Sequence, residues 1–391
     1  MYDFQTVINR RNTNNIKWDS IGKEYHEDDL LPLWIADMDF RANPKVLEEL
    51  QKIIDFGIIG YSDPSDSLYE EIIAWQKIQH QYEVPKEAIL FSSGVVPSIS
   101  LAIQAYTEIG DAVLINNPVY PPFARSVKLN QRKLVENRLV KRNNHYEIDF
   151  DLLEKQLVEE NVKLYLLCNP QNPGGRVWTK EELNKLGALC KKHHVLVASD
   201  EIHEDLVFAP SAHTTFANAG EDFADFSITM TAATKTFNLA GIKNSMVFIE
   251  SKDLREKFSH AQLRNNQHEI GTFGLVGTEA AYKYGDEWLL ELKKVLAQNL
   301  DLVEKELVGK TKIEWMRPEG TYLAWLDFSN YGLTDKEIEE RLIHKGKVVL
   351  NAGISFGNAG TQHMRLNVAA PKITIDEGIK RIKLAFEDLE N

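Results

Sequence analysis

The chain has 391 residues, of which 43% are hydrophobic and 26% charged, a composition typical of a globular protein with a large core. Its 45 Lys and Arg against 58 Asp and Glu give a net charge of −13, which disfavours a nucleic-acid partner or an anionic membrane surface. No apolar run is long enough to span a bilayer. The first eleven residues lack the apolar core of a signal peptide, and Cys168 and Cys190 form no disulfide framework, so we expect a cytoplasmic protein.

The N-terminal residues predict an arm rather than a folded unit. Residues 1–30 read as irregular, and an apolar stretch at 31–40, interrupted by two carboxylates, could form a strand that ends in a charged turn. Pro44 favours a helix start, since proline is tolerated in the first turn, and this helix ends near Gly57. Ser65 or Asp66 caps a second helix that runs to about residue 82.

Strands then alternate with helices. Apolar, strand-like runs occur at 88–91, 112–115, 162–167, 195–198, 226–230 and 245–249. Helices are expected at 98–106, after Pro122, and at 181–193, where Thr179 and Glu182 have capping-box spacing. This alternation predicts an α/β fold with a mostly parallel sheet covered on both faces.

The pattern changes after about residue 284. A long charged amphipathic helix is expected at 286–308, followed by strands at 322–327, 347–350 and 363–368 and helices at 335–344 and 375–389. This is an α+β unit. We therefore predict an N-terminal arm (1–43) that packs with the small domain, a large domain (44–284) and a small C-terminal domain (285–391).

Lys235 stands out because small hydroxyl residues flank it and a strand-like run precedes it. A lysine at a strand end in a covered site can lose its proton and act as an amine nucleophile. The alternative is an exposed loop lysine, which the stretch alone favours. Other residues of the chain decide between the two.

Three further turns carry polar residues at predicted strand ends, where open α/β sheets bind ligands. Gly94, at a helix start, suits a phosphate. The rigid loop Asn169–Gly175 leaves Asn172 available, although a plain turn is the alternative. Asp200 ends a buried strand and needs a cationic partner or dense hydrogen bonding, unless it only caps a helix.

An amine, a carboxylate, an amide and a phosphate cradle are together what pyridoxal 5′-phosphate (PLP) requires. Over essentially its whole length the chain resembles the fold-type-I PLP enzymes of the aminotransferase class I/II superfamily. The specific motifs of this resemblance are Asn172–Gly175, Asp200–His203 and Thr234–Gly241. On the stretches Asn9–Thr13, Trp34–Phe40, Gly60–Ser62, Asn117–Phe123 and Asp200–His203, the chain more narrowly resembles the MalY/PatB cystathionine β-lyase branch of C–S lyases.

The resemblance implies roles for individual residues. Lys235, Asp200 and Tyr120 would be catalytic: Lys235 would hold the cofactor covalently, Asp200 would pair with its ring nitrogen, and Tyr120 would stack on its ring. Cofactor contacts are implied for Gly94, Val95, Tyr120, Asn172, Asp200, His203, Thr231, Thr234, Lys235, Lys243 and Tyr61. Tyr61 would reach the cofactor phosphate of a partner subunit, which implies a homodimer with shared sites. Substrate contacts are implied for Arg365, Ala36, Asp37, Asn172 and Tyr61.

Two positions depart from the superfamily pattern. Ala232 stands where many members have a phosphate-binding serine, so Thr231 is expected to take its place. Lys243 stands where an arginine is usual, and a lysine neutralises phosphate without the fork geometry.

The implied activity is a β-lyase that converts L-cystathionine, or a related cysteine S-conjugate, to a thiol, pyruvate and ammonia. An aminotransferase is the alternative enzyme, because it uses the same residues. A cofactor-sensing regulator is a third possibility, disfavoured by the acidic charge and by the lack of a DNA-binding domain before residue 30. No His, Cys and acidic set has the spacing of a metal site, and none is expected.

Overall fold

The computed structural model describes residues 2–27, 29–142 and 144–390. A seven-stranded sheet in the order β2-β10-β9-β8-β7-β3-β4 forms the centre of the larger part. Only β10 runs antiparallel to its neighbours in this sheet, which confirms the predicted mostly parallel α/β fold. The strands are β2 (Ile89–Ser92), β3 (Ala112–Asn117), β4 (Lys133–Arg138), β7 (Val162–Cys168), β8 (Leu196–Asp200), β9 (Ser227–Thr231) and β10 (Ser245–Phe248).

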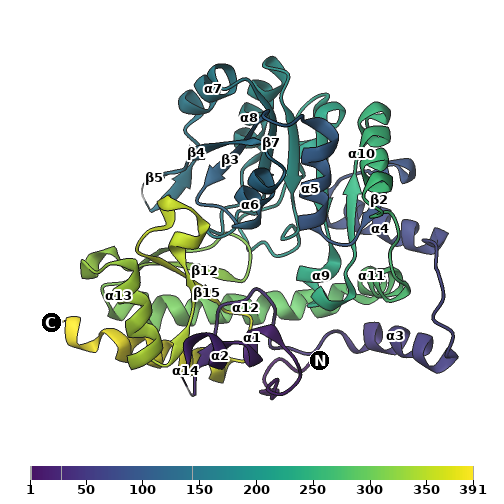
Figure 1. Cartoon of the computed structure of the whole chain (residues 1–391). Coiled ribbons are helices and arrows are strands. Elements are labelled where there is room, and N and C mark those ends of the chain that lie inside the picture. The colour runs from purple at the N-terminus through teal and green to yellow at the C-terminus, as the bar shows by residue number, and fades with distance from the viewer. Residues whose placement is uncertain (1, 28, 143, 391) are drawn as a thin grey trace.

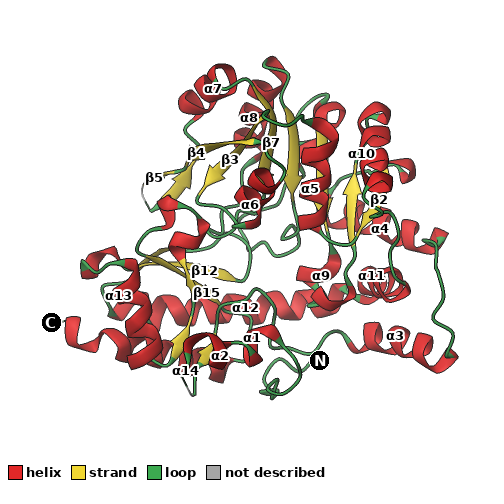
Figure 2. Ribbon diagram, viewed as in Figure 1, coloured by secondary structure: helices red, strands yellow, loops and turns green. Residues whose placement is uncertain are grey.

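Helices cover both faces of this sheet (Figures 1 and 2). Alternate residues of β7 face opposite sides: Leu164 and Leu166 pack with one set of helices, and Tyr165 and Leu167 with another. The first set is α5 (Val95–Tyr106), α6 (Pro122–Leu129) and α10 (Lys252–Arg264). The second is α7 (Phe150–Glu159) and α8 (Lys180–Lys192). Burial on both faces explains why the central strands are apolar throughout.

Several predicted helix ends are confirmed at the level of single hydrogen bonds. The side chain of Thr179 accepts from the backbone N–H of Glu182 and the reciprocal bond is also present, so α8 begins with a capping box. Ser65 caps α4 (Asp66–His80). Helix α3 (Pro44–Phe56) ends at Gly57, whose φ of +76° favours glycine. Helix α5 starts three residues earlier than predicted, directly after Gly94.

A smaller C-terminal domain holds a four-stranded antiparallel sheet in the order β11-β12-β15-β14. Its strands are β11 (Glu314–Met316), β12 (Leu323–Asp327), β14 (Asn351–Ala352) and β15 (His363–Asn367). Its helices are α12 (Asp286–Glu306), α13 (Asp335–Glu340) and α14 (Lys372–Phe386). The helix predicted at 335–344 changes to π-helical geometry at Arg341–Lys345. Helix α12 of this domain also extends to lie beside α11 (Thr272–Tyr284) (Figure 1).

The N-terminal residues differ from the irregular arm expected. They form two short helices, α1 (Ile16–Asp19) and α2 (Ile21–Tyr25), and a strand β1 (Leu31–Pro32) that pairs in parallel with β13 (Val348–Val349). The carboxylate of Asp39 organises this region, because it accepts hydrogen bonds from Lys17 Nζ at 2.8 Å and from the Trp18 indole at 2.9 Å.

Some elements have no counterpart in the sequence-based prediction. They are β4, the hairpin of β5 (Val140–Arg142) and β6 (His145–Glu147), α7, α10 and α11. The edge strand β4 carries Lys133, Glu136 and Arg138, which conceal its strand character in the sequence. Within the described part of the chain, every helix is too short or too polar to cross a bilayer.

Candidate active site

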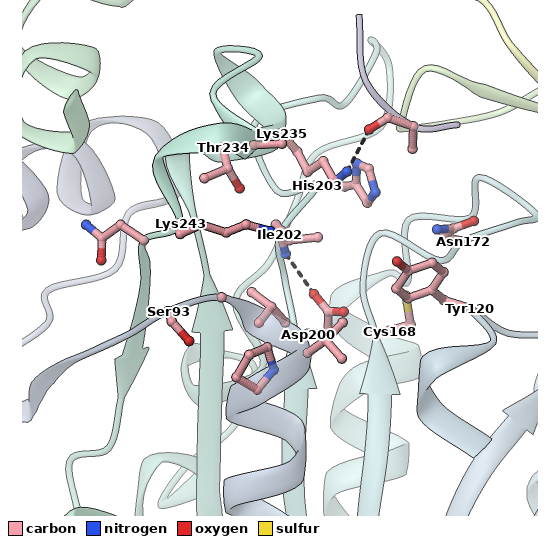
Figure 3. A pocket seen from close by; sticks show the side chains of 17 residues that line it. Ser93, Tyr120, Cys168, Asn172, Asp200, Ile202, His203, Thr234, Lys235 and Lys243 are labelled. Carbon is pink, nitrogen blue, oxygen red and sulfur yellow. Dashed lines mark hydrogen bonds between the residues drawn. The ribbon is translucent and has the colours of Figure 1, made fainter. Parts of the chain in front are cut away.

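A cavity of about 360 Å³ lies at the carboxyl ends of the parallel strands. Segments that follow β2, β3, β7, β8 and β9 each contribute side chains to it (Figure 3). The residues lining it are Ala36, Ser93–Pro97, Tyr120, Cys168, Asn172, Asp200, Ile202, His203, Thr234, Lys235, Ala240, Lys243 and Asn244. A cavity of this size accepts a small ligand.

Lys235 lies on α9 (Ala233–Thr236), a one-turn helix directly after β9, rather than on the strand end itself. Its Nζ donates to the backbone carbonyl of Ala36 at 2.6 Å. Burial, and then the charge of Arg365, lower the pKa of the Lys235 amine to about 8. A substantial fraction of this amine is therefore neutral in mildly alkaline solution and able to act as a nucleophile or base.

Asp200 ends β8, with its carboxylate 5% exposed. Oδ1 accepts from the backbone N–H of Ile202 at 3.1 Å, and no salt bridge reaches this carboxylate from any described residue. Burial raises the pKa of Asp200 to about 7. Such a carboxylate fits a ligand that brings its own N–H or positive charge.

His203 lies three residues further along the chain and is also buried. Its Nδ1 has no hydrogen-bond partner among the described residues. Burial, with the charges of Lys235 and Arg365, lowers the pKa of His203 to about 3 and keeps the imidazole neutral. A buried, unpaired nitrogen costs free energy, which a ligand that hydrogen-bonds to it would recover.

Arg365 on β15 joins the C-terminal domain to the site. Its Nη1 donates to Oδ1 of Asn172 at 2.9 Å, and its Nη2 donates to Oδ1 of Asn351 at 2.6 Å. The guanidinium lies 4.8 Å from the ring centre of Phe356, and Nε is buried with no hydrogen-bond partner among the described residues. Burial lowers the pKa of Arg365 to about 10, so the group stays charged at neutral pH.

One side of the cavity has the character of an anion site. Gly94 and Val95 form the start of α5, where backbone N–H groups and the helix dipole favour a negative group. Thr234 and the exposed Lys243 line the same cavity and add a hydroxyl and a positive charge (Figure 3).

The sequence matches the family model of aminotransferase class I and II over residues 29–382. The chain belongs to the aminotransferase class I and II family. Cystathionine beta-lyase PatB of Bacillus subtilis (strain 168) is 43% identical, with 98% of this chain and 100% of that protein covered.

Solved structures of family members have the same fold. Cystalysin from Treponema denticola, which contains a pyridoxal 5′-phosphate cofactor, superposes with a TM-score of 0.97, at 36% identity and with all of both chains covered. The PLP-bound C–S lyase from Staphylococcus hominis superposes with a TM-score of 0.90, at 32% identity, covering 99% of this chain and 100% of that one.

Four residues predicted from the family resemblance do not line the cavity. Arg365 is connected to it through its hydrogen bond to the lining residue Asn172. The hydroxyl of Thr231 donates to Oε1 of Glu204 at 2.6 Å and the residue is not part of the cavity lining, so its replacement of the missing serine stays a prediction. Asp37 is paired with Arg10, whose Nη2 lies 2.7 Å from Oδ2. Tyr61 is 99% exposed and makes no contribution to the cavity within one chain.

Other lining residues were missed. Ser93 and Asn244 are neighbours of Gly94 and Lys243, and their positions beside predicted residues were the available indication. Cys168 is buried and also lines the cavity. Tyr322, which does not line the cavity, had no sequence indication either: its hydroxyl donates to the Ala36 carbonyl at 3.0 Å, the same oxygen that Lys235 contacts.

Proposed function

We propose that the protein is a PLP-dependent carbon–sulfur β-lyase, which converts L-cystathionine or a related cysteine S-conjugate to a thiol, pyruvate and ammonia. The observation that carries this proposal is the pairing, in one cavity, of an amine with a lowered pKa and a buried carboxylate without a cationic partner. The 43% identical relative named cystathionine beta-lyase supports this choice of reaction.

The residues present fit PLP. The buried carboxylate of Asp200 would hold the ring nitrogen, and the unpaired Nδ1 of His203 and the amide of Asn172 would face the ring oxygen. Tyr120 would cover the ring, and Lys235 would attach the cofactor covalently. Its phosphate would occupy the cradle of Gly94, Val95, Thr234 and Lys243. When bound, PLP supplies an electron sink for negative charge at the substrate Cα.

The protein side chains perform the remaining tasks. Arg365 would bind the substrate carboxylate, for which a guanidinium has matching geometry. Once the substrate amine has displaced it from the cofactor, the neutral amine of Lys235 would remove the Cα proton, because its lowered pKa suits a general base near neutral pH. The electron pair left at Cα then forms the Cα–Cβ double bond as the thiolate leaves Cβ. Water hydrolyses the resulting unsaturated amine to pyruvate and ammonia.

An aminotransferase remains the alternative, since it would use the same residues. The deciding experiment gives the purified holoenzyme L-cystathionine without any 2-oxo acid. A β-lyase releases pyruvate and homocysteine in equal amounts, and the Lys235→Ala variant releases neither. Fast amino transfer to an added 2-oxo acid, with no pyruvate formed from cystathionine alone, would overturn the lyase assignment.

The attachment residue has its own test. Borohydride reduction of the holoenzyme, followed by peptide mapping, should place the cofactor on Lys235. Modification at another lysine would refute the proposed site independently of the reaction catalysed.

We also propose a homodimer in which Tyr61 reaches the partner's site. Helix α3 and the loop after it project from the body of the chain (Figure 1), and their apolar side chains are exposed: Phe56 by 72%, Ile58 by 71% and Ile59 by 60%. Such a contiguous apolar surface is typical of an interface. Tyr61 lies at its end, which supports a shared site.

Hybrid dimers test this arrangement. Tyr61→Ala and Lys235→Ala variants would each be nearly inactive. Mixed under conditions that exchange subunits, they would regain about a quarter of the wild-type activity, because half of the dimers would contain one intact site. No recovery in dimers proven to be mixed would place Tyr61 outside the partner's site.

The remaining assignments are also proposals. The division into an arm (1–43), a large domain (44–284) and a small domain (285–391) is supported by the two separate sheets. A cytoplasmic location is supported by two buried, unpaired cysteines, Cys168 and Cys190.

A further inference from the structure

A buried polar cluster lies on the side of the 201–205 segment away from the cavity. The segment contributes three acidic side chains, helix α4 contributes donors, and β9 and α9 contribute hydroxyls. The cluster consists of Trp75, Gln76, His80, Glu201, Glu204, Asp205, His213, Thr231 and Thr236. None of these residues lines the cavity, and the reaction proposed above uses none of them.

Asp205 accepts three hydrogen bonds within this cluster. They come from the Trp75 indole at 2.9 Å, from Nε2 of His80 at 2.8 Å and from the hydroxyl of Thr236 at 2.7 Å. Thr236 directly follows Lys235 on the one-turn helix α9. Such a short helix has little stability of its own, so its position depends on tertiary contacts.

Glu204 bonds to the other end of residues 231–236, at the last residue of β9. Its Oε1 accepts from the hydroxyl of Thr231, the last residue of β9, at 2.6 Å and from Nε2 of Gln76 at 2.8 Å. Residues 231–236 are thus tied at both ends to helix α4 through two adjacent carboxylates.

The charges on Asp205 and His80 make the hydrogen bond between them stronger than a neutral hydrogen bond would be. Burial opposes ionisation of His80, but Glu204 and Asp205 outweigh it and raise the pKa of His80 to about 9. Burial would raise the pKa of Asp205, but His80, Thr236 and Trp75 together lower it. At neutral pH the Asp205–His80 pair is therefore ionic, and hydrogen bonds to an ionised acceptor are the stronger kind.

The fold also brings His80, Glu204 and His213 close enough for their ligand atoms to lie within 4.8 Å of one another, which the sequence spacing did not indicate. The distances between the histidine nitrogens and the carboxylate oxygens indicate hydrogen bonds rather than coordination of a metal ion. Nε2 of His80 and Nε2 of His213 each lie 2.8 Å from another carboxylate, at hydrogen-bond distance, but 3.9 and 4.0 Å from Glu204.

We propose that Asp205, held by His80 and Trp75, positions Lys235 through its hydrogen bond to the hydroxyl of Thr236. Asp205 and Thr236 are positioning residues, since neither touches the cavity. This inference rests on one part of the proposed function, namely that Lys235 carries the cofactor. A misplacement of about 1 Å at a reacting group can cost about a hundredfold in rate, so a lost anchor one residue from Lys235 has a large effect.

The test compares three variants of the holoenzyme. Thr236→Val removes the hydroxyl at constant shape, and Thr236→Ser keeps it. Thr229→Val is the matched control: it makes the same change in β9 at a buried hydroxyl that has no partner among the described residues. Thr236→Val should lower kcat about tenfold or more while KM changes little, as expected for a misplaced reacting group. Thr236→Ser and Thr229→Val should behave as wild type.

A second readout is independent of the reaction catalysed. The pKa of the lysine–cofactor linkage, titrated by absorbance, should respond to the position of Lys235 among the charged groups that act on its free amine, which are Arg365, Asp37, Asp200 and Lys243. The linkage pKa should shift in the Thr236→Val variant and stay unchanged in Thr236→Ser and Thr229→Val. Because this titration needs only bound cofactor, it decides the inference even if the wild-type protein shows no lyase activity.

Three results would overturn the proposal. One is an unchanged kcat and linkage pKa in Thr236→Val, and another is an equal loss in Thr229→Val. The third is stoichiometric metal in the purified holoenzyme whose removal abolishes activity. Should Thr236→Val fail to fold, His80→Gln, which keeps a donor toward Asp205 without the charge, gives the same comparison: a shifted linkage pKa supports the proposal and an unshifted one refutes it.

Discussion

Arg365 of the C-terminal domain and Asn172, in the loop after β7, share a hydrogen bond of 2.9 Å at the rim of the cavity. Two further bonds, to Oδ1 of Asn351 and to the carbonyl of Trp34, fix the plane of the guanidinium. The buried Nε is left without a partner in the described structure. A planar, pre-oriented cation with two N–H donors that the described residues leave unused is suited to a carboxylate ligand.

The first prediction concerns this arginine. Arg365→Lys keeps the charge but loses the fork, so we expect KM for cystathionine to rise about 10- to 100-fold with a smaller change in kcat. Steady-state kinetics measure both. Arg317→Lys, at a half-exposed pair with Asp301 and Glu304, is the control and should leave KM unchanged. A fall in kcat alone would contradict a role in substrate binding.

The second prediction separates activity from stability at Asp200. Its raised folded-state pKa means that the folded apo-protein binds more protons than the unfolded chain between pH 4 and about 7. The free energy of unfolding therefore falls as the pH rises through this window. The full destabilisation by the buried charge of Asp200 is present above pH 7. Asp200→Asn removes the charge, so we expect the variant apo-protein to be more stable at pH 8 by about 2–4 kcal/mol.

Urea denaturation of both apo-proteins at pH 5 and pH 8 measures this difference. The stabilisation should be smaller at pH 5, where the wild-type carboxyl is protonated, and lyase activity of the variant should be nearly lost at either pH. Equal stability of the two proteins at pH 8 would show that the buried charge of Asp200 carries no cost.

The third prediction concerns the anion cradle. Lys243→Ala should weaken binding of PLP about tenfold or more, because a hydrogen bond to a charged group is lost, whereas Lys243→Arg should bind at least as tightly as wild type. Titration of the apo-protein with PLP, followed by absorbance, gives the dissociation constants. Unchanged affinity in Lys243→Ala would remove this residue from the phosphate site.

The fourth prediction addresses the N-terminal segment. Lys17 is 1% exposed and pairs with Asp39 at 2.8 Å. Asp39→Ala removes the nearer of two carboxylates from this buried cation and leaves only Asp37, at 3.5 Å, so it should destabilise the protein by about 3–5 kcal/mol, measured by urea denaturation. Glu48→Ala, which breaks an exposed pair with Lys45, should change stability by less than about 1 kcal/mol. Similar effects of the two changes would contradict a structural role for Asp39.

Several of the site residues predicted from the sequence lie at or shortly after the end of an apolar strand. Asn172 and Asp200 were identifiable because polar residues directly after buried strands need a reason to be there. The direction of the Thr231 side chain, which is bonded to Glu204, was not predictable, because a strand residue faces one side or the other and the sequence alone does not show which. Tyr322 and the His80–Asp205 contact depend on pairings between distant segments, which no local pattern records.

The same limit applied to the secondary structure. Elements with strong apolar periodicity, such as β7 and α12, were predicted within two residues of their ends. Helix α10 was missed because Lys252, Arg255 and Lys257 make its sequence resemble a solvated loop. It is stabilised by packing of Leu254 and Phe258 against the sheet, a tertiary contribution.

The antiparallel strand β10 has a consequence for how the protein matures. Ser92, beside the cradle glycine, pairs with Ser245, so the anion site closes only when residues 153 positions apart have met. Contacts of such long sequence separation form late in folding. A ribosome-bound chain that lacks residues 245–248 therefore has no phosphate site, and we expect the nascent protein to acquire its cofactor only after synthesis of the whole large sheet.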